Sequence, residues 1–153
     1  LLAQWQAQLP PEDWDPRRLV AEITEGVLVE QDPVTQANLQ ALRTAGMSMA
    51  IDDFGTGYSS LAYLSQLEVH MLKIDQRFTR QLGSDPKAQS LCEAIVMMAH
   101  RLGLQVVAEG VETRQAWVLL RNMGCDLAQG YLIAPAMPAT ALETFRFTPP
   151  ADD

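Results

Sequence analysis

The sequence is short of cysteine and of long apolar runs. Cys92 and Cys125 are the only cysteines among 153 residues and form no CxxC or Cys/His pattern, which is typical of two core thiols kept reduced. No apolar run reaches the ~20 residues that cross a bilayer, and the first residues have neither the basic start nor the cleavage site of a signal peptide. A cytoplasmic location is therefore expected, although other domains of the parent protein could anchor it to a membrane.

Basic residues are also scarce. The chain has 11 Lys and Arg against 19 Asp and Glu, a formal net charge of −8. With no basic stripe to neutralise a row of phosphates, a nucleic-acid polymer is excluded as a partner. A small phosphorylated ligand held through divalent metal ions is compatible with this charge, because bound cations invert the local electrostatics.

An initiator methionine is missing as well. The chain starts at Leu1 and is expected to begin inside a longer protein, while its length suits one domain with its own core. From residue 19 onward, strand-like runs alternate with helical patterns, which predicts an α/β chain of parallel strands, either an open doubly wound sheet or part of a (β/α)8 barrel. The predicted strands are Leu19–Thr24, Met47–Asp53, His70–Asp75, Gln105–Glu109 and Leu127–Ile133, with helices near 34–45, 58–66, 86–102, 114–123 and 139–145.

Several helix boundaries are marked by residues that have a physical reason to be there. Asp32-Pro33 and Asp85-Pro86 each place a side-chain acceptor at the cap and a proline at the first helical position. Gly46, Gly103 and Gly124 each stand where a helix should end in a left-handed residue. These signals support three of the predicted helices.

Carboxylates gather where the predicted strands end. In parallel α/β architectures the carboxyl ends of the strands converge on one face, where active sites are built. A carboxylate cluster resists burial unless a cation lies among its members, and Mg²⁺ and Mn²⁺ prefer oxygen ligands. A single acid at a strand end is more often a helix cap or a solvated loop residue, but here four strands share the pattern. The residues are Glu22 and Glu25, Asp52 and Asp53, Asp75, and Glu109 and Glu112.

Asp52, Asp53 and Lys73 indicate what such a site would do. Adjacent aspartates at a strand end can reach two metal ions or bridge between them, and two ions about 3.5–4 Å apart can clamp a phosphodiester. Lys73 lies on the charged face of the strand-like run 72–75, where it could orient an attacking water or neutralise developing charge. The residues alone thus predict a metal-dependent α/β enzyme that acts on a phosphate.

Two histidines and several arginines are not assigned to this site. Neither His70 nor His100 stands at the carboxyl end of a predicted strand, so both are interpreted as packing or surface residues. Arg77, Arg80 and Arg101 are interpreted as parts of solvated helix faces.

Five motifs follow one another along the chain, and together they resemble those of the EAL-domain cyclic di-GMP phosphodiesterases. The intervals of 30, 21, 36 and 20 residues between Glu22, Asp52, Lys73, Glu109 and Gln129 also match that family. Asp-Phe-Gly alone would fit a protein kinase too, but a glycine-rich nucleotide loop and a His-Arg-Asp segment are missing. The motifs, which place the resemblance over residues 19–145, are Glu22-Ile23-Thr24-Glu25, Asp52-Asp53-Phe54-Gly55-Thr56-Gly57-Tyr58-Ser59-Ser60-Leu61, Leu72-Lys73-Ile74-Asp75, Ala108-Glu109-Gly110-Val111-Glu112-Thr113 and Gln129-Gly130-Tyr131.

The resemblance implies a modified (β/α)8 barrel that hydrolyses cyclic di-GMP to linear pGpG with Mg²⁺ or Mn²⁺ at a two-metal site. Such a barrel needs ~200 or more residues, so this chain is expected to hold about five of its eight strands. Glu22 and Asp52 are implied as ligands of the first metal. Asp53 and Glu109, with Asp52 bridging, are implied for the second metal. Lys73 and Glu109 are implied as the catalytic residues that act on the water.

Two further roles follow from the resemblance. Gln129 is implied to contact the substrate near the second metal, and Glu25 to anchor the loop that follows Asp53. That loop, 54–61, is implied to couple dimerisation to metal binding. The chain departs from the family at 133–138, where the basic residue that usually precedes a proline is absent.

The family's Glu-Ala-Leu strand, and an asparagine on a following strand, lie N-terminal to anything in this sequence. Residues 1–153 are therefore interpreted as a single, N-terminally truncated EAL domain, with a helix end and connector at 1–18, βα repeats at 19–145 and a tail at 146–153. Missing strands leave open sheet edges, so a homodimer or a complementing N-terminal EAL segment is the expected partner besides cyclic di-GMP. Three functions stay open: a phosphodiesterase that acts with its N-terminal part, a catalytically inactive cyclic di-GMP-binding or dimerising regulatory fragment, and a truncation product without a role.

Overall fold

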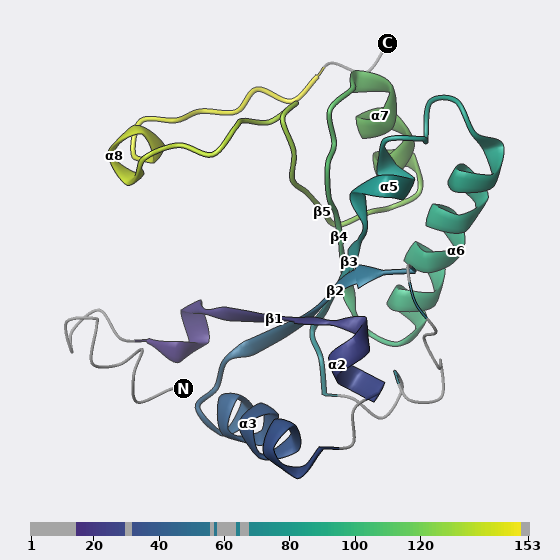
Figure 1. Cartoon of the computed structure of the whole chain (residues 1–153). Helices are drawn as coiled ribbons and strands as arrows, with labels where there is room; N and C mark the ends of the chain where they lie inside the picture. Colours follow the sequence, from purple (N-terminus) through teal and green to yellow (C-terminus); the bar gives the residue numbers. More distant parts are fainter. Residues whose placement is uncertain (1–14, 30–31, 56, 58–63, 65–67, 151–153) are drawn as a thin grey trace. The chain divides into compact units, whose positions relative to one another are not determined.

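The computed structural model describes residues 15–29, 32–55, 57, 64 and 68–150. The chain divides into two compact units, Leu1–Met71 and Leu72–Asp153, each with its own strands and helices. Figure 1 traces them along the sequence, from β1 to α8.

In its described residues, the first unit contains two parallel strands and the helices that connect them. β1 and β2 pair so that Val20 lies opposite Ser48. His70, near the end of this unit, is exposed but bound to β2, because its N–H donates to Met49 O at 2.9 Å and its Nδ1 accepts from Met49 N at 3.2 Å. The elements are η2 (Pro16–Arg18), β1 (Val20–Thr24), α2 (Glu25–Val29), α3 (Pro33–Thr44) and β2 (Ser48–Phe54).

Helix α3 forms where both of its ends are marked in the sequence. The Asp32 side chain accepts a hydrogen bond from Thr35 N at 2.9 Å, and Pro33 occupies the first helical position. Gly46 follows the helix with a φ of +87°. The predicted cap and stop are therefore confirmed for this helix. The helix buries Leu42, and the middle of β2 is buried as well.

The second unit also keeps its strands in chain order. β3, β4 and β5 lie side by side in that sequence, and β4 runs parallel to β5 with Val107 opposite Leu127. In Figure 1, α5, α6 and α7 lie on one side of these strands, whereas the segment that carries α8 leaves on the other. The elements are β3 (Met71–Ile74), which starts at the last residue of the first unit, α5 (Gln76–Thr79), α6 (Pro86–Arg101), β4 (Gln105–Ala108), α7 (Arg114–Asn122), β5 (Leu127–Ala128) and α8 (Ala139–Leu142).

The C-terminal segment returns to α7. Phe147 stands edge-on to Trp117, with the ring centroids 5.4 Å apart and an interplanar angle of 65°, an arrangement that aromatic pairs favour. In Figure 1 the segment after α8 runs back to the end of α7. The region interpreted as a tail therefore contributes packing to the second unit.

Most predicted elements are present, and the differences have local causes. The four strands β1 to β4 and the helices α3, α6 and α7 differ from their predicted ranges by at most one residue at each end. The short helices α2 and α5 were not predicted, because each begins directly at a strand end; α5 is capped by Asp75, which the prediction had assigned to the strand. The helix predicted near 58–66 falls, except for Leu64, outside the described residues. No helix in the described part is both long and apolar enough to cross a membrane.

Strand β5 is shorter than predicted, because the chain turns away after Ala128. A Cβ at Gly130 would lie 2.3 Å from both the N and the O of Val111, so only glycine allows the two backbones to approach this closely. Val111 N donates to Gln129 O at 3.1 Å, and Ile133 N donates to Gly130 O at 3.0 Å. The first bond joins the two segments, and the second closes a turn in the region where the sequence predicts strand as far as Ile133.

The two cysteines of the native protein are expected to react slowly with alkylating reagents. Both thiols are free, and burial raises the pKa of Cys92 and of Cys125 from 9.0 to about 11. Because the thiolate is the reactive form, the rate at pH 8 should fall about a hundredfold relative to the unfolded chain. Iodoacetamide labelling followed by mass spectrometry, with and without urea, measures this ratio. Equal rates in the two states would contradict the burial of the thiols.

Candidate functional site

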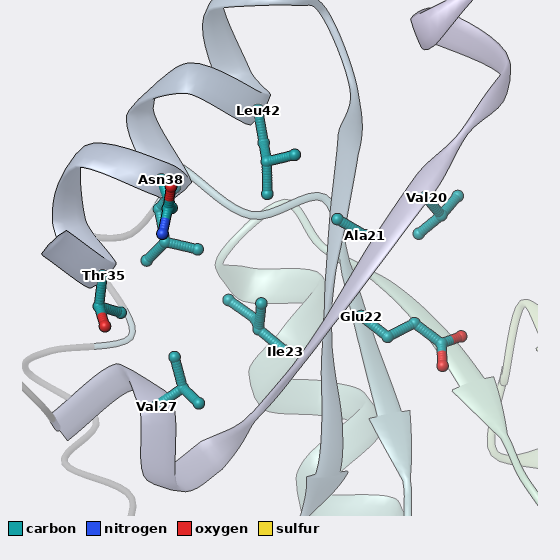
Figure 2. A pocket seen from close by; sticks show the side chains of 9 residues that line it. Val20, Ala21, Glu22, Ile23, Val27, Thr35, Asn38 and Leu42 are labelled. Atoms are coloured by element: carbon teal, nitrogen blue, oxygen red, sulfur yellow. The ribbon is translucent and has the colours of Figure 1, made fainter. Parts of the chain in front are cut away.

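The first unit places three of the predicted metal ligands on its two strands. Thr24 stands opposite Asp52 in the parallel register, so Glu22 and Asp52 lie on the same face of the strand pair. Figure 2 shows the Glu22 carboxylate pointing away from α3. One oxygen of Asp52 is fully buried, whereas Glu22 and Asp53 are exposed. All three residues offer carboxylate oxygens, the donors that suit Mg²⁺ and Mn²⁺.

Asp53 has an unusual backbone. Its φ of +55° is the one positive value at a non-glycine residue in the described part of the chain. This left-handed conformation is strained for most L-residues, although Asp and Asn tolerate it best. The regular strand backbone is therefore interrupted at Asp53, one residue before the end of β2, and strain of this kind is often found at functional sites.

Replacing Asp53 with alanine is expected to lower the free energy of unfolding by about 1 kcal/mol more than replacing it with asparagine. Both variants lose the carboxylate, so the difference between them isolates the backbone strain that asparagine tolerates and alanine does not. Urea unfolding of the two variants measures it. Asp53→Gly is the matched control and should be at least as stable as the alanine variant. If Asp53→Ala were as stable as Asp53→Asn and Asp53→Gly, the proposed backbone strain at residue 53 would be contradicted.

Glu25 connects the start of α2 to the loop that follows β2. It is 6% exposed, and its Oε2 accepts a hydrogen bond from Gly57 N at 3.2 Å. A Cβ on Gly57 would stand 3.1 Å from the Glu25 carboxylate, so a side chain at position 57 would crowd this contact. This hydrogen bond joins α2 to the loop after β2, two segments that are 32 residues apart. A residue that anchors the loop would need such a contact.

The second unit brings Lys73, Glu109 and Gln129 together. Lys73 Nζ lies 2.7 Å from Glu109 Oε1, and the two side chains are 6% and 16% exposed. Gln129 Nε2 donates a hydrogen bond to the same Glu109 oxygen at 3.3 Å. Three residues from the ends of β3, β4 and β5 therefore meet at a single carboxylate oxygen. The Lys73 ammonium, held by this carboxylate, is positioned to stabilise negative charge on a ligand.

The backbone of Glu109 is fixed from two sides. Its N–H donates to Ile74 O at 3.1 Å, and its carbonyl oxygen accepts a hydrogen bond from the fully buried Thr79 hydroxyl. The next residue, Gly110, has a φ of +61°, and a Cβ there would lie 2.5 Å from Gln76 Cβ. Sequence reasoning missed Thr79, because a threonine in a short helix gives no signal of a hydrogen bond across 30 residues.

The arginines of α5 and its end are paired with acids. Arg80 contacts Glu112 Oε1 through two nitrogens, at 2.7 and 3.1 Å, and this pair ties the end of α5 to the segment after β4. Arg77 Nε lies 3.2 Å from Asp75 Oδ1. Arg80 and Arg77 are exposed, as their interpretation as parts of solvated faces expects, with 51% and 64% of their side chains accessible; in addition, both form specific ion pairs.

Comparison with protein families identifies the domain to which these residues belong. Residues 2–136 match the model of the EAL domain. The chain belongs to the EAL-domain family. The cyclic di-GMP phosphodiesterase PA2567 of Pseudomonas aeruginosa is 46% identical over 131 residues, which cover 86% of this chain and 22% of that protein. The chain spans about a fifth of the length of the curated relatives it matches.

Solved EAL structures have the same fold over nearly the whole chain. The PaMucR phosphodiesterase in complex with cyclic di-GMP has a TM-score of 0.84 and 37% identity, over 93% of this chain and 57% of that one. The EAL domain of DcpA from Mycobacterium smegmatis has a TM-score of 0.79 and 39% identity, over 94% of this chain and 63% of that one. BlrP1 of Klebsiella pneumoniae, solved with manganese and cyclic di-GMP, has a TM-score of 0.77 and 34% identity, over 88% and 34% of the two chains.

These matches confirm the family and the fold that the five motifs predicted. The chain is an α/β fragment of the TIM-like EAL barrel, and the residues that the structure describes contain five of its strands. It is a fragment because it covers 57% of the PaMucR chain and 63% of the DcpA EAL domain.

Proposed function

We propose that this chain is the C-terminal part of a cyclic di-GMP phosphodiesterase and that its two units belong to one EAL domain. The observation that carries the proposal is the Lys73–Glu109 pair, a buried cation held at 2.7 Å by a carboxylate at a strand end. The 46% identity to the cyclic di-GMP phosphodiesterase PA2567 and the cyclic di-GMP complex of PaMucR support the substrate.

Four acids are proposed as the residues that hold Mg²⁺ or Mn²⁺: Glu22, Asp52, Asp53 and Glu109. Their oxygen donors fit these ions, and the BlrP1 structure with manganese and cyclic di-GMP supports the choice of ion. When bound, the ions supply positive charge that stabilises the transition state at the phosphate.

Lys73, Glu109 and Gln129 are proposed to act on the water and the substrate. Water oxygen bonds to phosphorus, the bond between phosphorus and the 3′ oxygen breaks, and that oxygen leaves with a proton, which gives pGpG. Lys73 donates a hydrogen bond to the water and offsets the developing negative charge, and Glu109 accepts the proton that the water releases. Gln129 fixes the direction of the Glu109 carboxylate and contacts the substrate.

The remaining assignments belong to the same proposal. Glu25 is the anchor of the loop after Asp53, supported by its hydrogen bond from Gly57 N. The protein acts in the cytoplasm, where its thiols stay reduced, either as a homodimer or with a complementing EAL segment. A catalytically inactive regulatory fragment is the second candidate, because the chain covers only 63% of the DcpA EAL domain.

The test uses the completed domain, which we define as this chain joined to the part of the DcpA EAL domain outside the 63% that it matches. With excess Mn²⁺, the completed domain should convert cyclic di-GMP to pGpG, and Asp52→Ala should abolish the product. The chain alone is assayed in parallel, and product from the completed domain only would indicate an enzyme that needs its N-terminal part. A folded completed domain that binds cyclic di-GMP without product would favour the regulatory fragment.

A further inference from the structure

Thr79 is a buried polar residue to which the proposed mechanism gives no role. It is the last residue of α5, and none of its surface is exposed. Its hydroxyl donates to the carbonyl oxygen of Glu109, the residue that directly follows β4. The same hydroxyl lies 3.1 Å from Gln76 O in its own helix. A hydroxyl has one proton to donate, and the contact with Glu109 is the shorter of the two.

Helix α5 lies tightly against the segment that carries Glu109. A Cβ at Gly110 would stand 2.5 Å from Gln76 Cβ and 3.3 Å from Gln76 Cα, and the φ of Gly110 is +61°. Only glycine allows both this conformation and this approach. The start of the helix is fixed to the end of β3, because the Asp75 carboxylate accepts a hydrogen bond from Arg77 N at 2.6 Å. Thr79 is thereby presented to the main chain of Glu109.

The main chain of Glu109 is held on both sides of its Cα atom. Its N–H belongs to the peptide plane before the Cα and donates to Ile74 O at 3.1 Å. Its carbonyl oxygen belongs to the peptide plane after the Cα and accepts from Thr79. Because peptide units are planar, holding both of them holds the φ and ψ of Glu109. The direction of its Cα–Cβ bond follows from these two angles.

This direction determines where the Glu109 carboxylate stands. Glu109 Oε1 lies 2.7 Å from Lys73 Nζ and accepts a hydrogen bond from Gln129 Nε2 at 3.3 Å. Since β4 ends at Ala108, the Glu109 carbonyl lies beyond the regular strand, and Thr79 supplies it with a donor from another element. A displacement of about 1 Å at a reacting group can cost roughly a hundredfold in rate.

We propose that Thr79 is a positioning residue of the hydrolysis, whose hydroxyl holds the main chain of Glu109 so that the carboxylate meets Lys73 and the attacking water. Thr79 acts through Glu109 and has no contact with the substrate in this role. The inference rests on the proposed function, because it gives Thr79 a part in that reaction. It requires the hydroxyl itself, since valine would fill the same space without a donor.

The experiment compares two substitutions of Thr79 in the completed domain. Thr79→Val removes the donor and should lower kcat about tenfold, with KM for cyclic di-GMP within about twofold of the unsubstituted value. Thr79→Ser keeps the donor and should retain about a third of kcat or more. Thr144→Val is the matched control, because the Thr144 hydroxyl is exposed and lies 3.2 Å from Ala141 O. It should leave kcat unchanged.

Amide hydrogen exchange tests the placement of Glu109 without catalysis. On the full 153-residue chain, Thr79→Val should speed exchange in residues 108–112 about fivefold or more, because the segment loses a main-chain contact. Thr79→Ser should leave these rates near those of the unsubstituted chain, and exchange in α3 should not change in either variant. Circular dichroism checks that the variants fold, and Thr79→Ala takes the place of Thr79→Val if valine prevents folding.

Three results would overturn the proposal. These are a normal kcat in Thr79→Val, unchanged exchange in residues 108–112, and a Thr79→Ser domain as slow as Thr79→Val, which would assign the effect to packing rather than to the hydroxyl. A folded, unsubstituted completed domain that forms no product is a different failure. It would remove the proposed hydrolysis, and the exchange rates would then decide by themselves whether Thr79 holds Glu109.

Discussion

Replacing Lys73 with methionine is expected to lower the turnover of cyclic di-GMP by the completed domain about a hundredfold or more. Methionine keeps the unbranched side chain up to one atom short of the ammonium nitrogen and removes its charge. The Lys73 ammonium lies 2.7 Å from Glu109 Oε1, and both side chains are largely buried. The substitution therefore leaves a buried carboxylate without this cation, and the free energy of unfolding should fall by about 3 kcal/mol. Initial rates and urea unfolding measure the two effects.

Lys87→Met is the matched control for this prediction. Lys87 is the other lysine of the chain and is exposed in the first turn of α6, so its loss should leave both rate and stability unchanged. Because the stability loss in Lys73→Met originates at the Glu109 carboxylate, adding Glu109→Gln should restore part of it. A Lys73→Met enzyme with normal turnover would remove Lys73 from the reaction.

Replacing Asp52 with asparagine is expected to lower turnover by the completed domain about a thousandfold and to weaken Mn²⁺ binding about tenfold or more. Asparagine has the same shape but no charge, so it cannot offset the charge of a divalent ion. Asp52 shares a face of the β1–β2 pair with Glu22 and has one fully buried oxygen. Calorimetric titration with Mn²⁺ alone measures binding, and rates over a range of Mn²⁺ concentrations show whether excess ion restores activity.

Glu68→Gln provides the comparison for charge alone. Glu68 lies in the same unit, and its side chain is 80% exposed and 4.0 Å from Arg43. An exposed ion pair of this length contributes little to the stability of the fold. The variant should therefore bind Mn²⁺ and turn over cyclic di-GMP as the unsubstituted domain does. Normal Mn²⁺ binding by Asp52→Asn would show that Asp52 is not a metal ligand.

The elements of this chain could be predicted where the signals are local. Asp32 and Asp85 cap α3 and α6 as expected, through hydrogen bonds from Thr35 N and Lys87 N within three residues of each cap. The end of β5 could not be predicted, because it depends on the close approach of Gly130 to Val111, a contact between separate segments. Local capping is visible in a sequence, whereas backbone packing between segments is not.

In the candidate site, too, residue types could be predicted from the sequence, whereas contacts between segments could not. The types and order of its charged residues predicted a metal-dependent site that acts on a phosphate, because clustered carboxylates repel one another unless a cation lies among them. The sequence could not predict the left-handed backbone of Asp53 or the hydrogen bond from Thr79 to the Glu109 carbonyl oxygen. Both are consequences of how the chain packs around the strand ends, and neither has a signature in residue type or spacing.

The edge-on contact between Phe147 and Trp117 has a practical consequence for producing this protein. The family match stops at residue 136, yet the aromatic partner of α7 lies beyond it. A gene fragment cut at the family boundary would leave the Trp117 ring without Phe147 and expose apolar surface of α7, and exposed patches of this kind promote self-association. The C-terminal boundary for expression should therefore be placed after the aromatic pair rather than at the end of the family match.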